Sequence, residues 1–207
     1  VLFLADEVIT GIGRTGNWFG CDTFGIRPDT MTVAKGLSSA YQPIAALVFS
    51  DEIYQGLLAG NDQIGFFGHG TTYSGHPVGA AVALKVLEII ERRNLIAHVR
   101  KVSQRFEERL RRFRGHPYVG DVRSVGLMGA IEFVRDKSNK SPFEPMGSFS
   151  RHVRAIAEEQ GVILRSLQVG DTVAFCPPLI ITEAEIDELF DRFSAALTTA
   201  QESYPTT

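Results

Sequence analysis

Two short stretches, each expected to form a strand and each ending in one charged residue, constrain the fold of this chain most. The first covers Val1 to Ala5 and is followed by Asp6; the second covers Thr30 to Ala34 and is followed by Lys35. The first is a near-continuous apolar run, which is typical of strands covered on both faces in a mostly parallel sheet. Ligands of open α/β sheets bind beyond the carboxyl ends of the strands. We therefore expect Asp6 and Lys35 to lie at one ligand-binding edge of an α/β sheet.

The residue types at these two strand ends allow two interpretations. Charges that approach a protein interior are usually paired, so Asp6 and Lys35 could form a buried ion pair. Alternatively, a lysine at the edge of an apolar sheet loses hydration, and its neutral amine can attack an aldehyde such as pyridoxal phosphate. A strand-end carboxylate would then keep the ring nitrogen of that cofactor protonated. Spacing alone leaves both interpretations open.

Three longer sequence motifs include these residues or follow them in the chain. They read ADEVITGIGRTGNWFG, PDTMTVAKGL and HGTTYSGHP, in this order along the chain. In their residues and in their order, these motifs resemble those of the class III aminotransferases, pyridoxal-phosphate enzymes of fold type I that include the ω-amino-acid:pyruvate transaminases. The resemblance covers the C-terminal half of such an enzyme. It implies that Lys35 binds the cofactor and is the catalytic base, that Asp6 supports the ring nitrogen, and that Val8 packs behind the ring.

The glycine-bounded loop from His69 to Pro77 is the expected phosphate site. The hydroxyls and backbone donors of Thr71 and Thr72 suit a phosphate, whereas Ser74 is expected to cap the helix that follows. By resemblance, this loop reaches across a homodimer interface to the cofactor phosphate of the partner subunit. Thr72 matches the usual threonine of the family, while Thr71 stands where an aromatic residue is common.

Arg165 is the candidate substrate-binding residue. It is expected at the end of a short strand, Val162 to Leu164, before the loop Ser166 to Asp171. A guanidinium group matches a carboxylate in bidentate geometry. The resemblance implies that this arginine binds the substrate carboxylate and can swing aside for an uncharged amine. The loop after Arg165 is slightly longer than is usual in the family.

The pattern of apolar residues predicts two domains that differ in their arrangement of helices and strands. Residues 1–93 are expected to form the C-terminal part of a large cofactor-binding domain, and residues 94–207 a small α+β domain. The expected helices of the first part run from Asp51 to about Leu58 and onward from Pro77, with Ile44 to Phe49 as a further, antiparallel strand. In the second part we expect helices around Val99, Val153 and Phe190, the last starting at a capping box on Thr182, and short antiparallel strands between them. The tail from Gln201 onward is expected to fray.

A second glycine pattern, Gly11-Ile12-Gly13-Arg14-Thr15-Gly16, satisfies the spacing GxGxxG behind a strand. A dinucleotide fingerprint needs these glycines to open a helix directly. Here the turn-rich aromatic segment Asn17 to Gly20 follows, and the next strand ends in lysine. We therefore predict that this motif does not bind a nicotinamide cofactor.

Composition excludes several classes of partner. The chain has 44% hydrophobic and 22% charged residues and a formal net charge of −3, so nothing favours nucleic acid or an anionic membrane as a partner. Its two cysteines, Cys21 and Cys176, lie far apart, and His69 and His76 have no acidic or cysteine companion, so neither a metal site nor a disulfide framework is expected. No apolar stretch approaches the roughly 20 residues of a membrane span. A reducing, cytoplasmic location fits this cysteine usage best.

Together these features predict a pyridoxal-phosphate aminotransferase that acts between an ω-amino acid or amine and a keto acid such as pyruvate. Because the chain begins with Val1 inside an expected strand, we expect it to be a fragment, a cleaved product or one piece of a split enzyme, which is inactive alone and needs an N-terminal half or complementary chain. Two alternatives stay open. The chain could be an inactive fragment or interaction subunit, or it could belong to an aminomutase or decarboxylase with the same cofactor.

Overall fold

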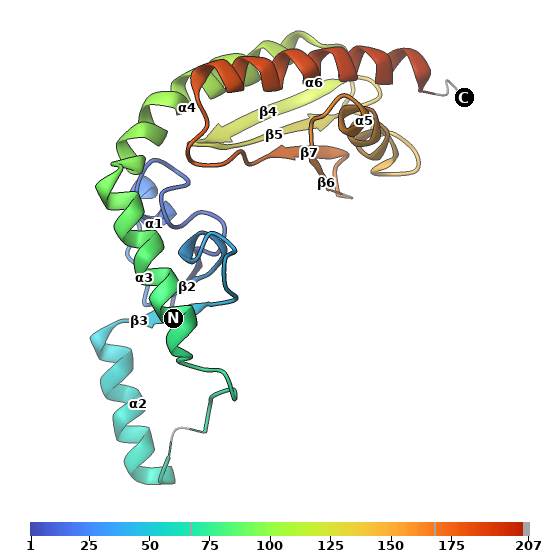
Figure 1. Ribbon diagram of the computed structural model, residues 1–207. Coiled ribbons are helices and arrows are strands. Elements are labelled where there is room, and N and C mark those ends of the chain that lie inside the picture. The colour runs from blue at the N-terminus through green and yellow to red at the C-terminus, as the bar shows by residue number, and fades with distance from the viewer. Residues whose placement is uncertain (67, 168, 205–207) are drawn as a thin grey trace. The chain divides into compact units, whose positions relative to one another are not determined.

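The computed structural model describes residues 1–66, 68–167 and 169–204, and it divides into two compact units (Figure 1). Unit 1 is Val1–Ala97 and unit 2 is His98–Thr207. The boundary falls in the first turn of helix α4 (Leu95–Arg111). The assignment of residues 1–93 to a large cofactor-binding domain and of 94–207 to a small domain stays a prediction.

Unit 1 contains a three-stranded mixed sheet in the order β1-β2-β3. Strands β1 (Leu4–Asp6) and β2 (Thr30–Val33) are parallel, with Asp6 opposite Thr32. Strand β3 (Ala46–Phe49) runs antiparallel to β2, as the family resemblance implies. The sheet therefore presents the carboxyl ends of two neighbouring parallel strands.

Strand β1 differs from its prediction because, of its two apolar residues, Ala5 is buried but Leu4 is not covered. Val1, Leu2 and Phe3 precede the strand and are exposed, and Leu4 is 58% exposed. In the described part of the chain, only β2 pairs with β1. The prediction of a strand buried on both faces is thus wrong for this chain, since burial requires neighbours that the described residues do not supply.

Two longer helices accompany the unit 1 sheet. Helix α2 (Asp51–Ile64) begins after Ser50, whose hydroxyl accepts the Ile53 N–H, and continues well past the predicted end near Leu58 to Gly65. Helix α3 (Pro77–Arg92) begins with its proline in the first turn, as predicted. The spacing of Val78, Val82, Val86 and Ile89 predicts one apolar stripe on α3, which is partly wrong because Val78 is exposed. The buried apolar residues of this unit cluster between α3 and the loops after β1 and β2; they are Ile12, Val33, Leu37, Ala83, Val86, Ile90 and Leu95.

Unit 2 is an α+β arrangement with one four-stranded antiparallel sheet in the order β4-β5-β7-β6. Its strands are β4 (Val119–Val125), β5 (Met128–Phe133), β6 (Arg165–Leu167) and β7 (Thr172–Phe175). Helices α4, α5 (Ser148–Glu159) and α6 (Glu183–Ser203) bury their apolar sides in one cluster with the inward side chains of this sheet. Figure 1 shows α4 and α6 running along the sheet.

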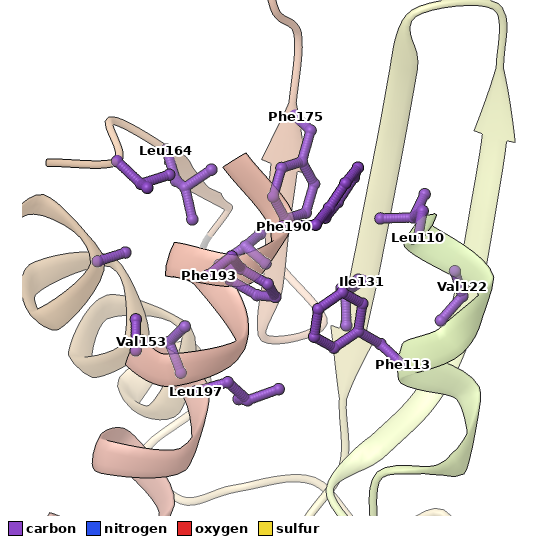
Figure 2. Close-up of a cluster of buried hydrophobic side chains, with 14 of the residues drawn as sticks. Leu110, Phe113, Val122, Ile131, Val153, Leu164, Phe175, Phe190, Phe193 and Leu197 are labelled. Carbon is purple, nitrogen blue, oxygen red and sulfur yellow. The ribbon is translucent and has the colours of Figure 1, made fainter. Parts of the chain in front are cut away.

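The core of unit 2 is rich in aromatic rings (Figure 2). Phe190 of α6 is fully buried and lies 5.3 Å, between ring centroids, from both Phe106 of α4 and Phe175 of β7. Phe149 of α5 stacks on Phe143, with ring centroids 4.4 Å apart. These contacts join all three helices and the sheet into one core, so unit 2 buries the apolar sides of its own elements against one another.

Two predicted features of unit 2 shift by a few residues. Val162 to Leu164 form no strand, because the Val162 N–H bonds to the Ala157 carbonyl at 2.8 Å and closes the end of α5, where Gly161 has a φ of 80°. The strand begins instead at Arg165. Helix α6 starts at the predicted capping box on Thr182 but continues through Gln201 to Ser203, so fraying from Gln201 is wrong. The predicted fraying beyond Tyr204 lies outside the described residues.

No helix in the described part of the chain is both long enough and apolar enough to cross a membrane.

Candidate active site

The carboxyl ends of β1 and β2 carry the two residues singled out by the sequence. Asp6 is the last residue of β1, and Lys35 follows β2 after one residue, Ala34, and starts the short 3₁₀ helix η1 (Lys35–Leu37). Both side chains are exposed. Lys35 has a φ of 43°, in the left-handed region that lysine rarely adopts. Strain of this kind gathers at functional sites, where the surrounding structure must hold it.

Asp6 is fixed by one of its two oxygens only. Its Oδ1 accepts the Val8 N–H at 3.0 Å and the Thr32 hydroxyl at 3.4 Å. Among the described residues, no donor bonds to Oδ2, so this oxygen is available to a ligand. Val8 itself is half-buried directly after the strand.

Asp6 and Lys35 do not form the buried ion pair that was one of the two interpretations. Neither side chain takes part in an ion pair with any described residue, and neither is buried. The expected loss of hydration at Lys35 is likewise not seen, because the Lys35 side chain is exposed among the described residues. The remaining interpretation, separate roles toward one ligand, is compatible with this arrangement.

Glu7 is a site residue that the sequence analysis missed. Its side chain points to the opposite side of the strand from Asp6 and is only 2% exposed. Its Oε2 accepts the Gly20 N–H at 2.8 Å and the Thr10 hydroxyl, and its Oε1 accepts the Cys21 N–H at 2.6 Å. Burial alone would raise the pKa of Glu7, but these hydrogen bonds outweigh it and lower the pKa from 4.5. Burial and the neighbouring Glu7 carboxylate raise the pKa of Cys21 to about 11.

The glycine-rich segment after Glu7 forms consecutive turns, not the start of a helix. Ile12, Gly13 and Gly16 have φ values of 58°, 90° and 85°. Helix α1 (Gly20–Phe24) does not begin at these glycines but four residues after the last of them, Gly16. This geometry differs from a dinucleotide fingerprint, as the sequence predicts.

Thr71 and Thr72 lie in the exposed segment between α2 and α3. The Thr71 N–H donates to the Ser74 hydroxyl at 3.0 Å, and the Ser74 N–H donates to the Thr71 carbonyl at 3.0 Å. Ser74 therefore closes a turn with Thr71 and does not cap α3; His76 does, accepting the Val78 N–H. Across the described residues, no hydrogen bond connects Thr71 or Thr72 with Asp6 or Lys35.

Arg165 belongs to unit 2 and is exposed at the first position of the edge strand β6, opposite Ala174. The predicted order, with Arg165 closing a strand, is wrong, because the strand starts here. The far end of the β6–β7 connection is held by Asp171, whose buried carboxylate accepts the Gly147 N–H at 2.8 Å and the Ser150 N–H at 2.7 Å. Part of the predicted loop after Arg165, at residue 168, lies outside the described residues.

Comparison with known proteins identifies the family. The family model for class III aminotransferases matches residues 1–197. The chain therefore belongs to the class III aminotransferase family.

Individual relatives agree with this assignment. The chain is 49% identical to an uncharacterized aminotransferase of Sinorhizobium fredii over 91% of this chain and 41% of that protein. It is 43% identical to the probable mitochondrial gamma-aminobutyrate transaminase 3 of Oryza sativa subsp. indica, over 98% of this chain and 39% of that protein. The structure of the omega transaminase from Pseudomonas jessenii in complex with PMP matches with a TM-score of 0.93 and 44% identity, over 98% of this chain and 44% of that chain. This chain thus spans about two fifths of the length of its curated relatives.

Class III aminotransferases use pyridoxal phosphate, and the residues at the strand ends fit this group chemically. The cofactor presents an aldehyde and a ring nitrogen that must stay protonated. Lys35 offers an exposed amine with no ion-pair partner in the described chain, and Asp6 offers a carboxylate oxygen that accepts no hydrogen bond there. Among the described residues, no group of three or more His, Cys, Asp and Glu side chains could hold a metal ion.

Proposed function

We propose that this chain supplies part of the active site of a pyridoxal-phosphate aminotransferase that acts between an ω-amino acid or amine and a keto acid such as pyruvate. The observation that carries the proposal is the pair at the carboxyl ends of β1 and β2, where Asp6 keeps Oδ2 free of donors and Lys35 is unpaired within the described chain. Gamma-aminobutyrate transaminases and omega transaminases among the relatives support this substrate class.

The proposal gives Lys35 and Asp6 different tasks. Lys35 holds the cofactor through Nζ and moves a proton at the substrate carbon that carries the amino group. Asp6 accepts a hydrogen bond from the ring nitrogen through Oδ2 and stabilises the positive charge there. Val8 packs behind the ring. When bound, pyridoxal phosphate supplies an electron sink for that substrate carbon.

Three further residues of this chain belong to the proposed site. The hydroxyls of Thr71 and Thr72, in an exposed turn, bind the cofactor phosphate of a partner subunit. Because no hydrogen bond ties this turn to the strand ends in the described chain, it is free to serve a second subunit of a homodimer. Arg165, exposed at the start of β6, binds the substrate carboxylate in bidentate geometry.

The remaining part of the site is proposed to come from an N-terminal half or complementary chain, in a reducing, cytoplasmic setting. The support for a second contribution is the length of the relatives and the exposed apolar residues Val1 to Leu4, before and at the start of β1. The 207-residue chain alone is then expected to be inactive.

Borohydride reduction in the presence of pyridoxal phosphate, followed by peptide mass mapping, tests the cofactor assignment. The measurement uses this chain alone and the full-length enzyme that would contain it. We expect the label on Lys35 in the full-length enzyme, loss of that label in Lys35→Ala, and no change in the matched control Lys85→Ala, whose lysine is exposed on α3 and pairs with Glu88. A label on another lysine with Lys35 unmodified would contradict the assignment. Formation of alanine from pyruvate and the amino donor then separates transamination from aminomutase or decarboxylase chemistry.

A further inference from the structure

Among the described residues of unit 1, Glu7 is the only buried carboxylate, and it lies beside the proposed cofactor residues. Thr15 and Ser38 are the other buried polar residues of that unit, and neither carries a charge. A buried charge is costly unless hydrogen bonds compensate it. The roles proposed for Asp6, Val8 and Lys35 do not use Glu7, so its burial needs a separate explanation.

The Glu7 side chain joins two ends of one loop. It leaves the end of β1 and binds the N–H groups of Gly20 and Cys21, at the start of α1, thirteen and fourteen residues further on. Gly20 makes room for the carboxylate, because a Cβ there would lie 3.1 Å from Glu7 Oε2. Gly11 lets the backbone turn back onto Glu7, because a Cβ there would lie 2.7 Å from the Glu7 carbonyl oxygen, which accepts the Gly11 N–H at 2.9 Å. The segment from Glu7 to Cys21 is thus closed around this carboxylate.

The closed loop contacts the segment that carries Lys35. Ile12, at the middle of the loop, is 4% exposed with a φ of 58°, which is unusual for a β-branched residue. It lies directly against Gly36, where a Cβ would be 3.1 Å from the Ile12 Cβ. Gly36 follows Lys35, whose own φ is 43°. Ile12 and Lys35, which both have positive φ values, are therefore connected through the close contact of Ile12 with Gly36.

We propose that Glu7 is a positioning residue for Lys35. By binding the amides of Gly20 and Cys21 it fixes both ends of the loop, the loop holds Ile12 against Gly36, and this contact keeps Lys35 in its left-handed conformation at the carboxyl end of β2. The Glu7 N–H, bonded to the Thr32 carbonyl at 2.9 Å, ties the same residue to β2 directly. The role of Lys35 toward a cofactor rests on the proposed function, whereas the mechanical link from Glu7 to Lys35 does not.

Amide hydrogen exchange of the unloaded full chain tests this link without any cofactor. The reporters are the amides of Leu37, Ser38 and Ser39, which bond to the carbonyls of Ala34, Lys35 and Gly36. In Glu7→Gln we expect these amides to exchange faster by on the order of tenfold, because the loss of a charge-assisted hydrogen bond loosens the loop. Ile12→Ala, which leaves Glu7 in place, should give the same local change. It also keeps the test open if Glu7→Gln does not fold.

The matched control is Asp22→Asn. Asp22 lies in the first turn of the same helix and accepts the Phe19 N–H at 3.0 Å, but it is exposed and does not bond to the Gly20 or Cys21 amide. Exchange at residues 37–39 should stay at its original rate in this variant. Unchanged exchange at 37–39 in both Glu7→Gln and Ile12→Ala would overturn the proposal. An equal acceleration in α3, at Val86 to Ile90, would also overturn it, because that result indicates a general loss of stability.

A second readout connects the link to the cofactor. In the full-length enzyme with pyridoxal phosphate, Glu7→Gln should slow borohydride-dependent labelling of Lys35 by on the order of tenfold, and Asp22→Asn should not. If the unsubstituted enzyme carries the label on a different lysine, the proposed function fails while the exchange result stands. If Lys35 is labelled at the original rate in Glu7→Gln, the positioning role fails while the proposed function stands.

Discussion

The two units are similar in length but bury very different amounts of apolar surface. In the described residues of unit 2, one cluster joins three helices to a complete antiparallel sheet around fully buried rings such as Phe149 and Phe190. In unit 1, a small cluster forms around Val33 and Val86, while Leu4 and Leu47 in the strands stay exposed. The difference shows that unit 2 covers the apolar side chains of its sheet with its own helices, whereas unit 1 leaves some apolar side chains of its sheet exposed. The proposed cofactor residues lie in the unit whose sheet is uncovered.

Producing the two units as separate chains tests this comparison, and it is the change for which we expect the largest effect. We expect a chain of residues 94–207 to unfold in one cooperative urea transition, because its core is closed and its sheet is covered. A chain of residues 1–97 should show a broad, shallow transition, since little apolar surface is exposed when it unfolds. Circular dichroism over a urea series measures both. A sharp transition of the 1–97 chain with a similar slope would show that the comparison is wrong.

Truncating a core ring of unit 2 should have the next largest effect. Phe190 is fully buried against Phe106, Phe113 and Phe175. Phe190→Ala in the full chain should lower the free energy of unfolding by about 3–5 kcal/mol, through lost burial and the cavity left behind. The control is Phe24→Ala in unit 1, a ring that is 61% exposed, where we expect a change within about 0.5 kcal/mol. Equal losses in the two variants would mean that Phe24 is covered in solution.

Asp171 and Glu7 allow a closer comparison, because each is a buried carboxylate that accepts two backbone N–H groups at the start of a helix. Asp171→Ala leaves the Gly147 and Ser150 N–H groups without this acceptor inside a closed core. We expect a loss of about 2–3 kcal/mol in the free energy of unfolding, measured by urea denaturation. Asp136→Ala is the control, since Asp136 is exposed and bonds only within its own turn to Ser138; its loss should be below about 1 kcal/mol. If both variants lose the same amount, burial of Asp171 has no special effect.

The sequence predicted what depends on local pattern. The starts of α3 and α6 follow from Pro77 and from the capping box at Thr182, and both are confirmed. The strand ends at Asp6 and near Lys35 follow from a short strand-like stretch and the charge behind it. The cofactor, substrate and phosphate roles of Asp6, Val8, Lys35, Thr71, Thr72 and Arg165 stay predictions, since no ligand is part of the structure.

Features that depend on distant backbone atoms could not be predicted in this way. Glu7 was missed because its partners are the amides of Gly20 and Cys21, which have no signature in side-chain type. Alternation along β1, which places Glu7 opposite Asp6, together with Gly11 and Gly20, is the signal that could have identified it. Val162 to Leu164 have a strand-like composition, yet the Val162 amide is used to end α5. Leu4 is exposed because no element among the described residues covers it, which its apolar side chain does not indicate.

The smallest expected effect is the pH dependence that Glu7 adds to unit 1. Its folded pKa lies below the ordinary value of 4.5, so it stabilises the fold at pH above 4.5, and this contribution is lost as pH falls through the folded pKa. Glu7→Gln cannot ionise and still offers one oxygen to an amide, so we expect a loss of about 1 kcal/mol at pH 7. The gap between the two proteins should close as pH falls below 4.5, because the carboxyl of the unsubstituted chain then becomes protonated. Urea denaturation at several pH values, followed by a probe within unit 1, measures this gap. A gap that stays constant from pH 7 to pH 3 would show that the charge of Glu7 contributes nothing, and that only the shape of its side chain holds the loop beside Lys35.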